Sequence, residues 1–214
     1  MIMNTAIIGL GNIGSQLAKN LTAGGENVIV ADRTLAKAEK LATELGGKAR
    51  PMPVADAISK SDVVVLAIYF DAIKDLLTTH RGSLAGKVIV DPSNPIAPDG
   101  KGGFKKTIPA DQSSGQLIAA LIPEGAELVK AFGTLAAQSL ASGVSRSPER
   151  AVLFYATDYP EAGRAVARLI TASGFSPVRV GGLDQSIRIE VGGDLHEFGK
   201  LGKLVSAKEA EALV

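Results

Sequence analysis

Cysteine is absent from this 214-residue sequence, and histidine occurs only twice. Without cysteine, the chain has no disulfides, thiolate nucleophiles, zinc ribbons or iron–sulfur clusters. An excess of one charge is also missing, because the formal net charge is +1 and the basic residues are dispersed. The sequence therefore lacks the electrostatic footprint of a protein that binds nucleic acid or anionic membranes, and we expect neither as a partner.

Long hydrophobic runs are missing as well. The longest apolar run spans residues 63–70, far below the length that a membrane-spanning helix requires. The N-terminus carries no basic region, and the apolar run after it is too short for a signal peptide. We therefore expect a soluble, cytoplasmic protein with no membrane insertion.

What the sequence does contain is a globular balance of 46% hydrophobic and 21% charged residues. Short β-rich runs alternate with helical periodicity, the pattern of a parallel sheet covered by helices on both faces. The expected strands are 4–9, 27–32, 62–68, 87–91, 127–131, 151–156 and 175–180, with a weak one near 48–51. The expected helices are 12–23, 35–45, 53–59, 71–79, 113–121 and 159–172. The predicted fold class is α/β, a doubly wound and mostly parallel sheet.

Two regions break this alternation. Residues 92–112 are rich in proline and glycine and predict a long loop, which in a compact domain is usually functional or disordered. From residue 183 the chain becomes polar, with Gly192-Gly193 before a last helix near 203–213. Between them, Asp158 and Glu161 have the spacing of a capping box and predict the start of the helix at 159.

The hexapeptide Gly9-Leu10-Gly11-Asn12-Ile13-Gly14 matches the GxGxxG pattern between an apolar strand and an amphipathic helix. Gly9 permits a tight turn, Gly11 lets the backbone approach a pyrophosphate, and Gly14 lets helix and strand pack closely. The helix N-terminus supplies amide groups and a positive dipole to the phosphates. We therefore predict a Rossmann-type dinucleotide-binding domain over residues 1–182, including its completing C-terminal strands, and a C-terminal helical extension over 183–214.

The choice between NAD and NADP depends on the end of the second strand. Asp32 stands 23 positions after the first glycine, where a carboxylate accepts both ribose hydroxyls of NAD. A carboxylate there repels a 2′-phosphate, by about 4 kcal/mol per unit charge at 4 Å and an effective dielectric of 20. In the alternative arrangement, Asp32 pairs with a neighbouring cation, and Arg33, Thr34 and Lys37 form a pocket for the 2′-phosphate of NADP. From the residues alone both cofactors stay open.

A second substrate is expected outside the carboxyl ends of the strands. Ile68 and Tyr69 follow one strand, and Tyr69 either lines the cofactor or is an ordinary strand-end aromatic. Asn94 either fixes the nicotinamide carboxamide or shapes the Asn-Pro turn. Phe132 and Thr134, on either side of Gly133, either face a planar acceptor or cap the core.

Acid–base residues are scarce. The Tyr-x-x-x-Lys pair of short-chain dehydrogenases is absent, and His196 is a candidate for a role at the substrate only by its place in a glycine-rich segment. About thirty residues follow the last expected strand, too few for the helical substrate domain of hydroxy-acid dehydrogenases. Hydride transfer between two redox cofactors needs stacking and orientation but no protein acid or base. We therefore predict no catalytic acid–base residue and no metal ligands.

Over residues 4–182 the sequence resembles the deazaflavin-dependent NADP oxidoreductases, which use coenzyme F-420 (also written F420). The resemblance is carried by the glycine fingerprint, by Arg33, and by later segments in matching order: Ala67-Ile68-Tyr69, Asp91-Pro92-Ser93-Asn94-Pro95, Ser113-Ser114 and Ala131-Phe132-Gly133-Thr134-Leu135. It departs from the family at Asp32, where a small residue is usual, at Tyr69, where proline is usual, and in its polar C-terminal stretch.

The resemblance implies hydride transfer between NADPH and a deazaflavin stacked on its nicotinamide, and it favours NADP over NAD. It implies that Gly11, Asn12, Ile13 and Arg33 contact the pyrophosphate and 2′-phosphoribose. Ile68, Tyr69 and Asn94 would lie along the nicotinamide, and Phe132, Gly133 and Thr134 beside the acceptor. FMN or FAD is an alternative acceptor, and a homodimer is the expected assembly.

Two other functions stay open. One is imine or carbonyl reduction of the pyrroline-carboxylate reductase type, which shares the N-terminal pattern but is expected to need a longer helical dimer domain. The other is a non-catalytic NAD(P) sensor, in which the 92–112 loop and the polar C-terminal helix serve a partner.

Overall fold

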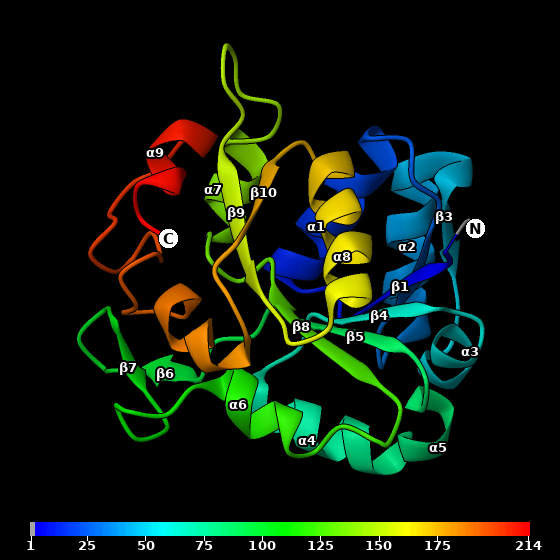
Figure 1. The fold of residues 1–214 in the computed structure, drawn as a ribbon. Helices are drawn as coiled ribbons and strands as arrows, with labels where there is room; N and C mark the ends of the chain where they lie inside the picture. The colour runs from blue at the N-terminus through cyan, green and yellow to red at the C-terminus, as the bar shows by residue number, and fades with distance from the viewer. Residues whose placement is uncertain (1–2) are drawn as a thin grey trace.

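The computed structural model describes residues 3–214 and contains one large twisted sheet with helices on both sides (Figure 1). The strand order of this eight-stranded sheet is β10-β9-β8-β5-β4-β1-β2-β3. Neighbouring strands are parallel except β8 and β9, which are antiparallel. The strands are β1 Thr5–Ile8, β2 Val28–Ala31, β3 Ala49–Pro51, β4 Val63–Leu66, β5 Val88–Asp91, β8 Glu127–Ala131, β9 Val152–Ala156 and β10 Ser176–Arg179. The predicted mostly parallel, doubly wound sheet is confirmed.

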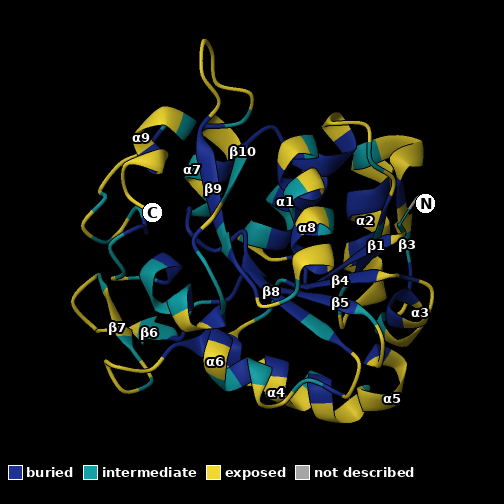
Figure 2. Cartoon of the chain, in the orientation of Figure 1, coloured by how far each residue is buried: buried dark blue, intermediate teal, exposed yellow. Residues whose placement is uncertain are grey.

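Two helical layers cover the sheet and create two cores. The longer α-helices are α1 Asn12–Ala23, α2 Leu35–Leu45, α4 Phe70–Thr79 and α8 Pro160–Ala172, and the shorter ones are α3 Val54–Ser59, α5 Arg81–Leu84, α6 Ser114–Ala119, α7 Ala137–Ser142 and α9 Ala207–Glu211. One core packs α1, α2, α7 and α8 on the sheet, and the other packs α3 to α6. Successive strand residues alternate between the two, as Val64 and Val65 of β4 do. The central strands β1, β4 and β5 are therefore buried on both faces, while the outer helix faces are exposed (Figure 2).

The position of β1 determines where a ligand is expected. β1 lies between β2 and β4, because the chain runs outward from β1 to β3 and then returns to the other side of β1. In doubly wound sheets ligands bind outside the carboxyl ends of the strands at this reversal. The turns after β1, β4, β5 and β8 open on this one edge, because these four strands are parallel.

The predicted long loop at 92–112 contains structure that the sequence pattern did not indicate. Two three-residue strands, β6 Ile96–Pro98 and β7 Phe104–Lys106, pair in an antiparallel hairpin. The Thr107 N–H donates to the Pro95 carbonyl at 2.7 Å, so the base of the hairpin closes on the turn after β5. Strands this short leave no periodicity to detect.

The predicted capping box at Asp158 and Glu161 is wrong. Tyr159 is the N-cap of α8 without a side-chain cap, and the Asp158 carboxylate instead accepts a hydrogen bond from the Leu183 N–H at 3.1 Å. A true capping box joins Ser206 and Glu209 at the start of α9. Asp158 bonds to Leu183, 25 positions away, instead of capping α8. No spacing in the sequence indicates such a distant partner.

Residues after β10 form a third, smaller core with the edge of the sheet. A 3₁₀ segment, η2 Leu183–Ile189, is followed by an irregular stretch and by α9, which is shorter than the predicted helix at 203–213. Ile189, Leu195 and Val205 pack with Phe154 of β9 in this core. Within residues 3–214, no helix has both the length and the apolar character needed to cross a membrane.

Candidate functional site

The glycine turn after β1 has the geometry that its sequence pattern predicts. Gly9 has φ +92°, a left-handed conformation that disfavours side chains, and a Cβ there would lie 2.5 Å from the Ala67 carbonyl oxygen. A Cβ on Gly14 would lie 1.9 Å from the Gly9 carbonyl oxygen. These two glycines therefore bring α1 into close contact with the ends of β1 and β4.

Gly11 differs from its two neighbours because space is open around it. A Cβ at Gly11 would meet no atom within 4 Å, and Gly11 is the N-cap of α1 without a side-chain cap. No acidic residue lies in the first turn of α1. The helix therefore presents its N-terminal amides and dipole to solvent, which is the arrangement that binds phosphate.

A cleft of about 500 Å³ lies over this helix terminus. Its lining comes from the glycine turn, α1, α2 and the start of α7: Leu10, Gly11, Asn12, Ser15, Gln16, Lys19, Lys37, Ala137 and Gln138. Two of these residues are cationic and none is acidic. The cleft suits an anionic ligand by both its charge and its backbone.

Asp32, directly after β2, turns its carboxylate toward the glycine turn. Its Oδ2 accepts a hydrogen bond from the Leu10 N–H at 2.9 Å, and its Oδ1 accepts one from the Thr34 N–H at 3.3 Å. The Lys37 ammonium group lies 3.3 Å from Oδ2. Burial acts to raise the pKa of Asp32, but these hydrogen bonds and Lys37 outweigh it and hold the pKa below its usual range. Asp32 is therefore a charged group with partners inside the protein.

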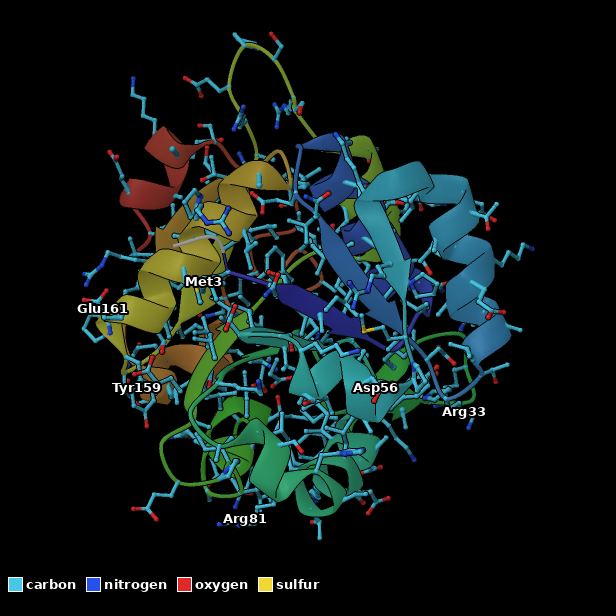
Figure 3. All side chains as sticks on the ribbon, turned by 90° about the vertical axis from the view of Figure 1, so that its right-hand side faces the viewer. Met3, Arg33, Asp56, Arg81, Tyr159 and Glu161 are labelled. Atoms are coloured by element: carbon cyan, nitrogen blue, oxygen red, sulfur yellow. The ribbon has the colours of Figure 1, made fainter. Side chains whose placement is uncertain are left out.

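The residues expected to distinguish NADP from NAD lie together after β2. Arg33 and Thr34 are exposed, and the Arg33 side chain projects at the surface of the molecule (Figure 3). The half-exposed Lys37 side chain lines the cleft and also forms an ion pair with Asp32. Of the two arrangements open from the sequence, the structure has the one in which Asp32 pairs with a cation.

The end of β4 contributes Ile68 and Tyr69. The Ile68 side chain is partly buried against the core on the α4 side and approaches Gly9. Tyr69 is the N-cap of α4 and is 88% exposed, the most exposed of the large hydrophobic side chains in residues 3–214. An aromatic ring in solvent between β4 and α4 is available to a ligand.

A single backbone carbonyl joins the segments after β5 and β8. The Gly133 carbonyl accepts hydrogen bonds at 3.0 Å from Asn94 Nδ2 and, on its other side, from His196 Nε2. Asn94 Oδ1 in turn accepts from the Val191 N–H at 2.7 Å. The Asn94 amide thus links the Gly133 segment to Val191, and it uses one of its two Nδ2 hydrogens to do so.

His196 is buried and has a defined tautomer. Its Nδ1 accepts a hydrogen bond from the Phe198 N–H at 2.9 Å, so the ring proton lies on Nε2 and is donated to Gly133. Burial lowers the pKa of His196 and outweighs the Gly133 carbonyl and Glu197, which favour the imidazolium ion. The imidazole is therefore neutral and in contact with backbone atoms.

Phe132 and Thr134 lie on the inside of the same segment. Phe132 is 0% exposed, packs in the core on the α1 side, and has φ +64°. Thr134 is buried, and its Oγ1, like Ser93 Oγ, has no hydrogen-bond partner among residues 3–214. Of the two positions open for Phe132, the structure has the core.

Sequence reasoning missed a buried charge cluster beneath these segments. The Lys130 ammonium group lies 2.7 Å from Asp91 Oδ2, 2.8 Å from Ser114 Oγ and 3.8 Å from Glu190 Oε1, and it also donates to the Ser93 carbonyl. The side chains of Asp91, Lys130 and Glu190 are each at most 2% exposed. The sequence does contain a sign of this cluster, because charged residues stand inside strands that are otherwise apolar and expected to be buried on both faces.

Comparisons with known proteins agree with this geometry. A family model described as coenzyme F420-dependent NADP oxidoreductase matches residues 4–95. The F420-dependent NADP reductase of Methanothermobacter thermautotrophicus is 30% identical over 201 residues, which cover 89% of this chain and 86% of that enzyme. This chain belongs to the F420-dependent NADP oxidoreductase family. The family resemblance predicted from the sequence is confirmed, and the chain is an oxidoreductase of a NADP-dependent family.

Several solved structures share the fold of this chain. A hypothetical protein from Sinorhizobium meliloti is 33% identical, has a TM-score of 0.84 and matches over 95% of both chains. A candidate F420-dependent NADP reductase from an Arthrobacter species has a TM-score of 0.74 at 21% identity, covering 86% of this chain and 87% of that one. A reductive aminase from Aspergillus terreus shares the fold at a TM-score of 0.61 and 20% identity, and the chain spans 56% of that enzyme.

Proposed function

We propose that the protein transfers hydride between NADP(H) and a deazaflavin or flavin-type acceptor, with coenzyme F420, FMN or FAD as the ring. The observation that carries the nucleotide half is the N-terminus of α1, which has no acidic residue in its first turn and is open at Gly11. Two lysines, Lys19 and Lys37, line the cleft over it. A pyrophosphate fits both the charge and the exposed amides.

The state of Asp32 supports NADP rather than NAD. A carboxylate that selects NAD repels a 2′-phosphate by its charge, and here that charge is stabilised within the protein, because both oxygens of Asp32 accept hydrogen bonds from backbone N–H groups. Lys37 offsets its charge at 3.3 Å, which lowers the repulsion that a 2′-phosphate would meet. The exposed Arg33 guanidinium group is then free to form paired hydrogen bonds to that phosphate.

The acceptor half is proposed from the segments after β4, β5 and β8. NADP, when bound, supplies or receives the hydride at its nicotinamide ring, and the chain's own residues orient the two rings. Ile68 and Tyr69 would flank the nicotinamide, and the backbone of Gly133 and Thr134 would form the floor beside the acceptor. The neutral His196 and the engaged Asn94 support a site that positions rings without exchanging protons.

The test combines binding with transfer in the purified protein. Titration with NADPH and NADH, followed by nucleotide fluorescence, should give at least tenfold tighter binding of NADPH. Stopped-flow mixing of the NADPH complex with oxidised F420 or FMN should then show reduction of one ring. Tight NADPH binding without transfer to any ring would favour the non-catalytic sensor, and turnover of a cyclic imine alone would favour the imine reductase.

Arg33→Ala tests the phosphate contact directly. We expect this variant to weaken NADPH at least tenfold and NADH less than twofold, because only NADPH carries the 2′-phosphate. Arg50→Ala on β3 removes an exposed arginine from the other end of the strands and is the matched control. Equal weakening of both nucleotides by Arg33→Ala would contradict the proposed contact.

A further inference from the structure

Residues 190–198, here called the strap, run from η2 across the ends of β5 and β8. Its first two residues, Glu190 and Val191, contact the start of α6 and the turn after β5. The Glu190 carboxylate accepts hydrogen bonds from the Ser114 N–H at 3.1 Å, the Gly115 N–H at 3.0 Å and Ser114 Oγ at 2.8 Å. Val191 then donates its N–H to Asn94. The start of α6 and the Asn94 turn are thus held by neighbouring residues of the strap.

The other end of the strap holds the segment after β8. His196 Nε2 donates to the Gly133 carbonyl, and the Glu197 N–H donates to the Thr134 carbonyl at 3.2 Å. The Glu197 carboxylate accepts hydrogen bonds from the Ala136 N–H and from Ser139 Oγ, at the start of α7. α7 also lines the nucleotide cleft through Ala137 and Gln138.

The contacts of Val191, His196 and Glu197 reach the segments after β5 and β8, which are proposed to surround the acceptor, whereas those of Glu190 reach the start of α6. Two carboxylates seven positions apart, Glu190 and Glu197, occupy the N-termini of α6 and α7. His196 and Asn94 meet on one carbonyl oxygen between them. The strap therefore adds a second connection between the Asn94 turn and the Gly133 segment, beside their direct hydrogen bond.

We propose that the strap aligns the acceptor side of the site, with His196 and Glu197 as positioning residues for hydride transfer. This inference rests on the proposed function. Hydride transfer is sensitive to geometry, and misplacement by about 1 Å can cost a factor of about 100 in rate. The glycine turn and the N-terminus of α1, which carry the proposed pyrophosphate contact, receive none of these hydrogen bonds, and the strap reaches the nucleotide cleft through Glu197 at the start of α7.

Two substitutions of His196 separate positioning from simple support of the strap. In His196→Gln, the amide nitrogen replaces Nε2 and still donates to the Gly133 carbonyl, while the acceptor for Phe198 is lost. In His196→Asn, the amide oxygen replaces Nδ1 and still accepts from Phe198, while the Gly133 contact is lost. His80→Gln and His80→Asn are matched controls, because His80 is the only other histidine and lies at the end of α4.

The first measurement is amide hydrogen exchange, which needs no acceptor. His196→Asn should accelerate exchange in peptides covering 92–96 and 132–137 but not in those covering α1, and His196→Gln should match the wild type. The affinity for NADPH should stay within twofold in both variants. Unchanged exchange in His196→Asn, or equal acceleration by both variants, would overturn the inference.

The second measurement is single-turnover hydride transfer from bound NADPH to the ring acceptor. We expect His196→Asn to slow transfer about tenfold or more, and His196→Gln to stay within threefold of the wild type. Glu197→Ala should slow transfer similarly and Glu197→Gln should restore it, with Glu44→Ala on α2 as the control. Transfer at the wild-type rate in His196→Asn would also overturn the inference. If the wild type reduces no ring, the proposed function fails and the positioning role in hydride transfer fails with it, while the exchange result still decides whether His196 links the two segments.

Discussion

Lys130 and Asp91 are register partners in adjacent parallel strands, and their side chains form a salt bridge of 2.7 Å that is almost completely buried. Both residues stand at the carboxyl ends of β8 and β5, directly below the segments proposed to surround the acceptor. A second carboxylate, Glu190, lies 3.8 Å from the same ammonium group. One buried cation therefore offsets two buried anions.

Lys130→Met is expected to be strongly destabilising, because it leaves two carboxylates without their cation. Removing one partner of a buried pair typically costs about 3–5 kcal/mol. Urea denaturation should show this loss as a lower midpoint, and Lys40→Met on the exposed face of α2 should change stability little. The double variant Lys130→Met/Glu190→Gln should recover part of the loss, and a single variant as stable as the wild type would contradict the charge arrangement.

Gly11→Ala is expected to weaken nucleotide binding, whereas Gly14→Ala is expected to lower the stability of the fold. A methyl group at Gly11 meets no protein atom within 4 Å, so the fold should persist while the space for a phosphate is filled. We expect an unchanged melting temperature and at least tenfold weaker NADPH binding. A methyl group at Gly14 would lie 1.9 Å from the Gly9 carbonyl oxygen, so this variant should be destabilised itself. Thermal melts and titrations of both variants decide the point.

Lys37→Ala is expected to shift nucleotide preference toward NADH. It removes the cation that offsets Asp32, and it leaves the carboxylate's hydrogen bonds to Leu10 and Thr34 in place. Lys37 is half-exposed, so screening limits the effect, and we expect about a fivefold change in the NADPH-to-NADH affinity ratio. Lys40→Ala on the same helix is the control. An unchanged ratio would show that Lys37 does not influence the 2′-phosphate.

Stability is expected to fall as the pH is lowered from about 6.5, because of His196. Burial lowers its pKa below the usual value of about 6.5, so in the intervening window the unfolded chain binds a proton that the folded protein does not. The stabilisation that His196 contributes is therefore complete above about pH 6.5. It decreases as the pH falls from about 6.5 to the lowered pKa of the folded protein. Chemical denaturation between pH 7 and 5 should show this slope in the wild type and in His80→Gln. A slope of the same size in His196→Gln would assign it to other groups.

The nucleotide half of the site was predictable because its signals are local. The glycine turn, the strand before it and the helix after it lie within residues 5–23, and Gly9 and Gly14 each have a steric reason. The sequence left two arrangements open for Asp32. Its hydrogen bond to Leu10 and its ion pair with Lys37 depend on the folded turn and could not be predicted from the sequence. The roles of the fingerprint residues in cofactor binding stay predictions until a nucleotide is bound.

The acceptor half was less predictable because its contacts join distant parts of the sequence. Glu190 meets Ser114 across 76 positions, and Glu197 meets Ala136 across 61. Neither glutamate belongs to a spacing pattern, and residues 190–198 contain no regular helix or strand. The resemblance identified the Asn94 and Gly133 segments but not the strap that joins them. The homodimer also stays a prediction, which light scattering after size exclusion would test.

The Gly133 carbonyl has a consequence for how the protein folds. Its two hydrogen-bond donors lie 39 and 63 positions away in the sequence, whereas β1, α1 and β2 form a unit of neighbours. Contacts of large sequence separation carry a higher loop-closure cost and form late. During refolding, we expect the nucleotide-binding turn to mature before the acceptor side does. A chain interrupted at that stage would have its local glycine-turn unit formed, with the α7 side of the nucleotide cleft and the ring partner's place still unassembled.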